Sequence, residues 1–175
     1  MTSKGKKGCD MFLKFLFGVA MVAFSSFCGY VLAKKYRQRK AFFQQLKEFN
    51  ERYLSEVSYY RRPIKTFAAS YAYKGDFARL LNLFFQYLDN GQARAFEVDF
   101  KAELPFLRQD DRQVVADYFF MLGRGDSSSQ KGYFTGIKDR LSALYNEAIS
   151  DCKKYGDLYI KLGFLCGLFI LILII

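Results

Sequence analysis

The chain has 175 residues, room for one modest domain, and its 27 Lys or Arg against 17 Asp or Glu give a formal net charge of +10. It contains no His, the commonest metal ligand and the usual general base at neutral pH, so the composition argues against an enzyme, a metal site or another cofactor. The four Cys have no metal-type spacing, and Cys28 and Cys166 lie in apolar stretches, which argues against a disulfide framework.

Residues 1–14 form a basic tail, and residues 15–33 form a first apolar stretch without charge, FLFGVAMVAFSSFCGYVLA. At about 1.5 Å per residue, a helix over this stretch is about 28 Å long, close to the hydrocarbon thickness of a bilayer. A cleaved signal peptide is the alternative, because VLA before Lys34 has the small-residue spacing of a cleavage site. The length of the stretch and the basic flank KKYRQRK behind it favour a retained transmembrane helix.

Residues 158–175 form a second apolar stretch, LYIKLGFLCGLFILILII, whose one charge is Lys161. A helix over this stretch is about 27 Å long. The ammonium of Lys161 can reach back to the lipid headgroups. We therefore expect a second transmembrane or membrane-embedded helix here.

The region between these stretches is basic at both ends. Residues 34–161 carry 23 basic and 16 acidic side chains, a net charge of +7. By the positive-inside rule this predicts that residues 34–157 form a cytoplasmic domain, held against the anionic lipid of the membrane. Most aromatic residues fall on apolar helical stripes rather than beside basic residues, which argues against a nucleic-acid partner.

Apolar periodicity in residues 34–157 predicts an all-α bundle of about five or six helices, with no strand of useful length. The first helix should continue out of the membrane stretch to about Tyr60, and Pro63 should stop it or open a short second helix. The buried face expected on the first helix comprises Phe42, Leu46, Phe49, Tyr53 and Val57. The inward residues expected on the second are Ile64, Phe67, Ala68 and Tyr71.

A third helix is expected over residues 77–88, with Asp76 as its N-cap and Asp-Asn-Gly at 89–91 as its C-cap. A fourth should run through Ala93, Phe96 and Phe100 and end at Pro105. Asp110 or Asp111 should cap a fifth. Its expected inward residues are Val114, Val115, Tyr118, Phe119 and Leu122.

The stretch LGRGDSSSQKG, residues 122–132, is predicted to be a helix–helix turn. Gly123 and Gly125 would supply left-handed backbone, and Ser127 with Gln130 would form a capping box for the next helix. A phosphate loop needs a different glycine spacing after a strand, and an adhesion motif needs an extracellular loop. The next helix should bury Phe134, Ile137, Leu141, Leu144 and Ala148, with Gly156 as the interruption before the membrane.

Three blocks of the sequence resemble the stage III sporulation protein AB family of endospore-forming bacteria. The first, SEVSYYRRPIKTF, matches through Glu56, Val57, Tyr59, Pro63 and Ile64. The second, YFFMLGRGDSSSQ, matches through Leu122, Gly123, Asp126 and Gln130. The third, KLGFLCGLFILILII, matches through Leu162, Gly163, Leu165 and Gly167.

This resemblance implies a non-enzymatic membrane component of the sporulation channel complex between mother cell and forespore. It also implies a soluble domain similar to the helical cytoplasmic domains of type II secretion platform proteins, with a sporulation-specific secretion-type ATPase and other membrane subunits of the channel as partners. The alternative is a membrane-surface adaptor that binds anionic lipid without an ATPase partner. The candidate interaction or family-motif residues are Glu56, Tyr59, Pro63, Leu122, Gly123, Asp126, Gln130, Gly163 and Gly167. Gly163 and Gly167 also form a small-x-x-x-small pair, which can pack one helix on another in a membrane.

Overall fold

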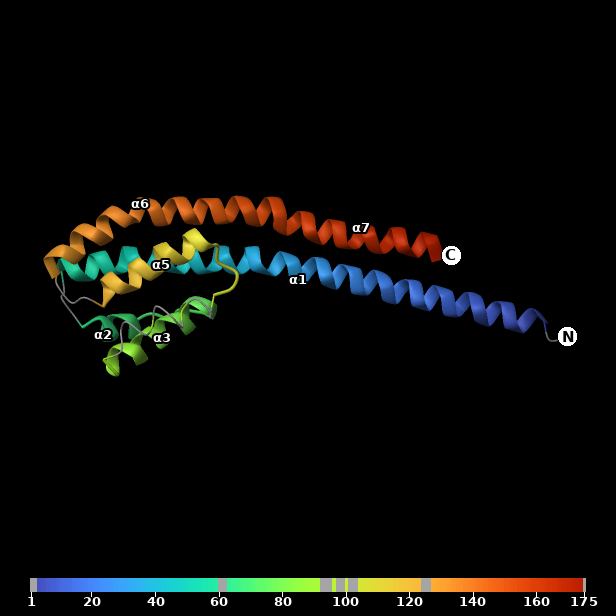
Figure 1. Ribbon diagram of the computed structural model, residues 1–175, viewed down its shortest axis with the longest axis horizontal. Coiled ribbons are helices and arrows are strands. Elements are labelled where there is room, and N and C mark those ends of the chain that lie inside the picture. Colours follow the sequence, from blue (N-terminus) through green and yellow to red (C-terminus); the bar gives the residue numbers. More distant parts are fainter. Residues whose placement is uncertain are drawn as a thin grey trace. The chain divides into compact units, whose positions relative to one another are not determined.

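The computed structural model describes residues 3–59, 63–91, 96, 100, 104–123 and 127–174, and of residues 3–15, 57–59, 127–130 and 174 it describes the backbone only. Every regular element in this part of the chain is a helix (Figure 1), which confirms the all-α prediction for these residues. The chain divides into two compact units. We call Met1–Arg37 with Ser150–Ile175 the paired unit, and Gln38–Ile149 the bundle.

Helix α1 runs without a break from Ser3 to Tyr59 and contributes to both units. It confirms the prediction that the first helix of the bundle continues from the apolar stretch. Its buried residues in the bundle include Phe42, Leu46, Phe49 and Tyr53, as their spacing predicts. The side chain of Val57 lies outside the described residues.

Helix α2 (Ile64–Ala69) begins directly after Pro63, which is its N-cap. Phe67 and Ala68 are buried, as predicted, and Ile64 is half-buried. The prediction that Tyr71 points inward is wrong, because its side chain is 39% exposed beyond the end of the helix. The guanidinium of Arg52 lies 4.5 Å from the centroid of the Tyr71 ring, so this ring makes a cation–π contact at the surface.

Helix α3 (Gly75–Asp89) begins two residues earlier than an Asp76 cap allows, so that prediction is wrong. Lys74 is the N-cap, and Gly75 has a φ of +62°, which Gly adopts at little cost. The amide of Gln45 on α1 replaces a side-chain cap. Its Nε2 donates to the Lys74 carbonyl at 2.8 Å, and its Oε1 accepts from the Lys74 N–H at 2.6 Å.

The predicted end of α3 is confirmed. Asn90 is the C-cap, and Gly91 follows with a φ of +67°. Most of the predicted fourth helix, including Ala93, lies outside the described residues. Phe96 and Phe100 are helical and buried.

Helix α5 (Gln109–Leu122) buries Val115, Tyr118, Phe119 and Leu122, as predicted, while Val114 is half-buried. Its N-cap is Arg108 rather than Asp110 or Asp111. Asp111 nevertheless serves the helix terminus from inside the first turn, because its Oδ2 accepts the Arg108 N–H at 3.2 Å.

The prediction of left-handed backbone at Gly123 is wrong, since its φ is −80°. Its N–H still donates to the Phe119 carbonyl at 3.1 Å, so the chain leaves α5 along the helical path. Gly125 lies outside the described residues, as do the side chains of Ser127 and Gln130, so the capping box stays a prediction.

Helix α6 (Ser127–Asp151) is followed by a π-helical turn, η1 (Cys152–Gly156), and by α7 (Asp157–Ile174). The predicted interruption at Gly156 is the end of this π turn. The buried face predicted for α6 is confirmed, with Ile137 half-buried and the following residues buried: Phe134, Leu141, Leu144 and Ala148.

Half of the core side chains that the structure describes in the bundle are Phe or Tyr. Phe49 on α1 lies at the centre of this aromatic core. Its ring centroid is 5.5 to 6.4 Å from five other rings, contributed by α1, α2, α3, α5 and the loop before α3, namely Tyr53, Phe67, Tyr73, Phe77 and Tyr118. Rings at such distances gain stacking and edge-to-face attraction beyond the burial of their area.

Candidate functional site: a pair of apolar helices

Two helical segments of the chain, Leu16–Glu56 and Lys131–Leu173, are long and apolar enough to cross a membrane. Each contains an apolar window of 18 residues, of which only 17% and 11% are buried. The core helix of a soluble protein would be mostly buried over such a length. The large apolar side chains of these windows are exposed instead, among them Phe24, Phe27 and Phe169 at 63 to 64%. A bilayer would cover this surface.

Within the paired unit, the first part of α1 and α7 run antiparallel beside each other (Figure 1). Near the ends of the chain, Val22 contacts Gly167. Further from the ends, Gly29 contacts Tyr159. The N-terminal end of α1 and the C-terminal end of α7 therefore lie at the same end of this unit.

Glycines bring the two backbones into direct contact. A Cβ atom on Gly29 would lie 2.5 Å from the carbonyl oxygen of Tyr159, and one on Gly163 would lie 2.8 Å from the carbonyl oxygen of Ser25. These neighbours are backbone atoms, which cannot move aside by a change of rotamer. Only Gly fits at either position without separating the helices.

The same contact continues along α7. A Cβ atom on Gly167 would lie 2.8 Å from the Cα of Val22. Between these positions, the Ser25 hydroxyl donates to the Gly163 carbonyl at 2.7 Å, which is how polar side chains join helices in apolar surroundings. We call Gly29, Gly163 and Gly167 the glycine seam.

Aromatic and basic side chains gather where the two apolar stretches end. The ring of Tyr36 stacks on those of Tyr155 and Tyr159, with centroids 5.6 and 6.0 Å apart. The Nζ of Lys35 lies 5.0 Å from the Tyr36 centroid, and the Nζ of Lys154 lies 5.1 Å from the Tyr155 centroid. We call these three tyrosines and two lysines the collar. Tyrosine and lysine are typical of the boundary between a bilayer and water.

The bundle holds a buried ion pair of Arg39 with Asp111, to which Glu147 and Arg108 are joined. The guanidinium of Arg39 lies 3.4 Å from Glu147 Oε2, and Arg108 also pairs with Glu147. This cluster links α1, α5 and α6. Its carboxylates are matched by guanidinium groups, so its geometry suits a structural tie better than acid–base chemistry.

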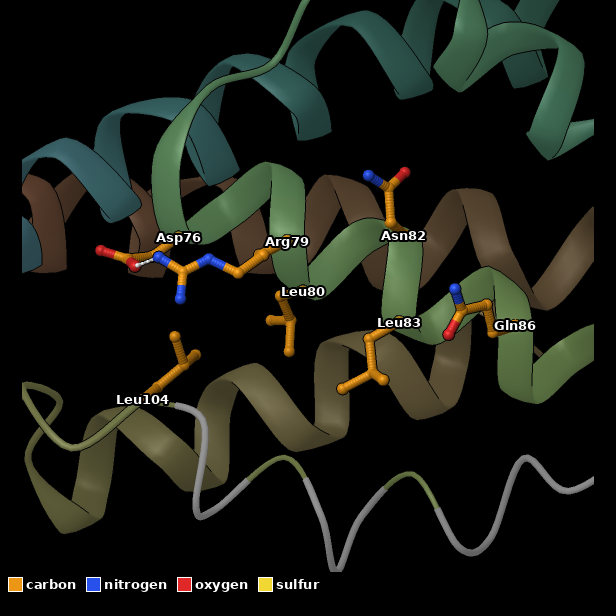
Figure 2. Close-up of a pocket in the computed structure, with 7 residues that line it drawn as sticks. All are labelled: Asp76, Arg79, Leu80, Asn82, Leu83, Gln86 and Leu104. Carbon is orange, nitrogen blue, oxygen red and sulfur yellow. Dashed lines mark hydrogen bonds and ion pairs between the residues drawn. The ribbon is translucent and has the colours of Figure 1, made fainter.

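A half-open cavity of about 280 Å³ lies along α3 in the bundle (Figure 2). An ion pair between Asp76 Oδ1 and Arg79 Nη2, at 2.8 Å, occupies one part of its wall. The rest of the wall consists of Leu80, Asn82, Leu83, Gln86 and Leu104. Among the described residues of this lining, no nucleophile stands beside a general base.

The described residues contain no group of three or more Cys, Asp or Glu side chains that could hold a metal ion. Burial raises the pKa of the Tyr118 phenol well above its usual value, because its surroundings disfavour the charged form. Its hydroxyl has no hydrogen-bond partner in the described part of the chain. A phenol held neutral in an aromatic core packs the bundle and does not exchange protons near neutral pH.

The candidate residues of the sequence fall at separate places. Glu56 is buried in the bundle, Pro63 is exposed at the start of α2, and Leu122 is buried at the end of α5. Gly123 is exposed after Leu122, and Gly163 and Gly167 are in the seam. Asp126 and the side chains of Tyr59 and Gln130 lie outside the described residues.

Sequence reasoning missed Gly29 and Ser25, the partners of Gly163 in the seam. The signal was available, because Gly18, Ser25 and Gly29 are small residues at helical spacing within the first apolar stretch. It also missed the role of Asp111 as the buried partner of Arg39.

A family model described as stage III sporulation protein AB matches residues 14–175. The chain belongs to this family. The match spans both apolar helices and the whole bundle, and it makes the chain a sporulation-stage protein. Neither a curated protein nor a solved structure gives a significant match to this member of the stage III sporulation protein AB family.

Proposed function

We propose that this chain is a non-enzymatic membrane platform of the sporulation channel complex, which joins mother cell and forespore. The observation that carries the proposal is the glycine seam, because it pairs two exposed apolar helices that stand before and after one folded helical bundle. A membrane hairpin of this kind anchors a bundle of about five or six helices at both of its ends.

In the proposed topology, the bundle faces the mother-cell cytoplasm. Five cations lie between Lys34 and Lys40, and Lys153, Lys154 and Lys161 lie before or within the start of the second apolar helix. The positive-inside rule keeps such flanks on the cytoplasmic side. Residues 1–14 would then be on the opposite side of the membrane, which the C-terminal end of α7 would also reach.

The seam also supports retention of residues 15–33 as an anchor instead of their removal as a signal peptide. Cleavage after Ala33 would remove Ser25 and Gly29 and leave the glycine face of α7 open to lipid. We expect the membrane-extracted protein to keep its full mass of 20.4 kDa. Intact mass spectrometry that finds a product starting at Lys34 would contradict this topology.

By family resemblance, the bundle would be similar to the cytoplasmic domains of type II secretion platform proteins, and it would dock a secretion-type ATPase. Affinity purification of the tagged full chain from sporulating cells tests this function. We expect an ATPase and ring-forming channel subunits to co-elute. As a matched control, the same tag on a variant with Gly29→Leu and Gly163→Leu, which separates the helix pair, should recover less of the membrane subunits.

The second candidate is a membrane-surface adaptor that binds anionic lipid and has no ATPase partner. The exposed lysines of the collar favour it, because they lie at the end of the apolar helices. Recovery of anionic lipid without any ATPase in the same purification would support the adaptor and overturn the platform.

A further inference from the structure

The collar carries two cations, on Lys35 and Lys154. Lys35 and Lys154 are exposed, and neither forms an ion pair with a carboxylate in the described part of the chain. Four further exposed cations stand on the same short segments, namely Lys34, Arg37, Lys153 and Lys161. The acidic residues there are Asp151 and Asp157, so six cations face two carboxylates.

The collar adjoins an apolar surface on both helices. On α1, Val31 and Leu32 are 49% and 48% exposed, two to three residues before Lys34. On α7, Leu158 and Leu162 are 45% and 44% exposed on either side of Lys161. A molecule that suits this place has a negative headgroup at the level of the lysines and apolar chains beside these residues.

The tyrosine stack gives the place a fixed shape. The three rings of the collar are half-buried and nearly parallel, with interplanar angles of 26° and 19°. Phenol rings stacked in this way hold the two helix ends together and keep their hydroxyls at the headgroup level. The Nζ atoms of Lys35 and Lys154 lie 5.0 and 5.1 Å from ring centroids of this stack.

We propose that the collar binds the headgroup of an anionic phospholipid. The ammonium groups of Lys35 and Lys154 would pair with the phosphodiester, the tyrosine hydroxyls would donate to its oxygens, and the acyl chains would lie along the exposed residues of α1 and α7. The headgroup of a zwitterionic lipid carries a cation of its own, which the lysines repel, so such a lipid should bind less tightly. The inference rests on the membrane insertion of the proposed function, and it assigns a lipid class to one set of residues.

The test uses the full chain in neutral detergent, with native mass spectrometry to count bound lipids and a thermal melt to measure stabilisation. The probes are phosphatidylglycerol, phosphatidylcholine and glycerol 3-phosphate. We expect phosphatidylglycerol to bind in preference to phosphatidylcholine and to raise the Tm, and glycerol 3-phosphate to do neither. Equal binding of the two lipids, or full stabilisation by glycerol 3-phosphate, would overturn the proposal.

The variant Lys35→Gln/Lys154→Gln removes the two collar cations. Its apparent affinity for phosphatidylglycerol should fall about thirty-fold, as expected for the loss of two cations at a membrane surface. The matched control Lys138→Gln/Arg140→Gln removes the same charge from exposed positions on α6 and should change the affinity by less than about two-fold. An equal loss in both variants would mean that diffuse charge attracts the lipid, and the collar assignment would be wrong.

Tyr36→Leu keeps every charge and removes the central ring of the stack. We expect this variant to lose part of the preference for phosphatidylglycerol. Its Tm in the absence of lipid is the control that shows whether the chain still folds. Flotation with phosphatidylcholine vesicles reads insertion separately. If the unchanged protein floats but shows no lipid preference, the collar proposal alone is wrong. If the unchanged protein does not float, the result contradicts the membrane platform itself.

Discussion

Arg39 and Asp111 form a buried two-point ion pair between α1 and α5. Nε of Arg39 donates to Oδ2 of Asp111 at 2.7 Å, and Nη2 donates to Oδ1 at 3.0 Å, with both side chains only 3% exposed. The fork of the guanidinium matches both carboxylate oxygens, which is the geometry in which a charge pair survives outside water. Each charge depends on the other, because either one alone would be costly at this depth.

Asp111→Asn therefore should destabilise the bundle strongly. It removes the carboxylate charge that pairs with Arg39 at two points and leaves the half-exposed Glu147, 3.4 Å away, as a weaker partner for the buried cation. The expected loss in the free energy of unfolding is about 3–5 kcal/mol. Equilibrium unfolding of the full chain in detergent, followed by far-UV circular dichroism, measures it. The control is Lys65→Ala, which removes an exposed ion pair with Asp89 and should cost at most about 1 kcal/mol. Equal effects of the two changes would mean that the buried pair does not hold α1 to α5.

Alanine at the glycine seam should weaken the helix pair. Gly163→Ala places a methyl group 2.8 Å from a backbone carbonyl, so the helices must separate, at a cost of about 1–3 kcal/mol. Gly136→Ala on α6 is the matched control, because nothing lies within 4 Å of a Cβ there. It should stabilise the chain by about 0.5–1 kcal/mol through helix propensity. Opposite shifts of the Tm are thus expected from the same chemical change, and shifts of the same sign would contradict the close approach.

Phe49→Ala should be the most damaging single truncation in the aromatic core. The ring is fully buried and meets rings from four helices and a loop, so its removal leaves a cavity that no one neighbour can fill. The expected loss is about 3–5 kcal/mol in the free energy of unfolding. Phe120→Ala, at a ring 54% exposed on α5, is the comparison and should cost far less.

Tyr118 should make the chain sensitive to alkaline pH. An unfolded tyrosine loses its proton near its usual pKa of 10.0, whereas burial raises the pKa of folded Tyr118 well above that value. Above pH 10 the unfolded state therefore binds fewer protons, and the free energy of unfolding falls as pH rises. The stability that Tyr118 contributes is present below pH 10 and is lost above it.

Tyr118→Phe removes this proton and should make the alkaline decline shallower. Below pH 10 the change should be neutral or stabilising by about 1 kcal/mol, because the hydroxyl it removes is buried without a hydrogen-bond partner in the described part of the chain. Urea titrations of the detergent-solubilised chain at pH 8 and above pH 10 compare the two proteins. A variant with the same decline as the parent would show that other groups set the alkaline limit.

Much of the fold could be predicted because a helix repeats its buried face every three or four residues. That rule found Phe134, Leu141 and Ala148 on α6. On α1 it found Phe42, Leu46, Phe49 and Tyr53. The C-cap glycine of α3 was found because its chemistry is local.

The predictions that failed or were incomplete concern positions whose role depends on a residue distant in the sequence. Asp76 looked like a cap in sequence, but the amide of Gln45 on another helix fixes that turn. Asp111 looked like a cap as well, and nothing local shows that its carboxylate meets an arginine 72 positions away. Gly163 was a candidate from its spacing, while the carbonyl that makes it necessary belongs to Ser25.

The hydrogen bond of the seam joins Ser25 to Gly163 across 138 positions of sequence, so it cannot form before nearly the whole chain has been synthesised. Until α7 has been synthesised, the small residues of the first apolar helix have no partner helix. They are then exposed to other transmembrane helices in the bilayer. A ribosome that stalls before α7 is made would leave these small residues unpaired. Membrane-embedded proteases would then have an unpaired transmembrane helix to recognise.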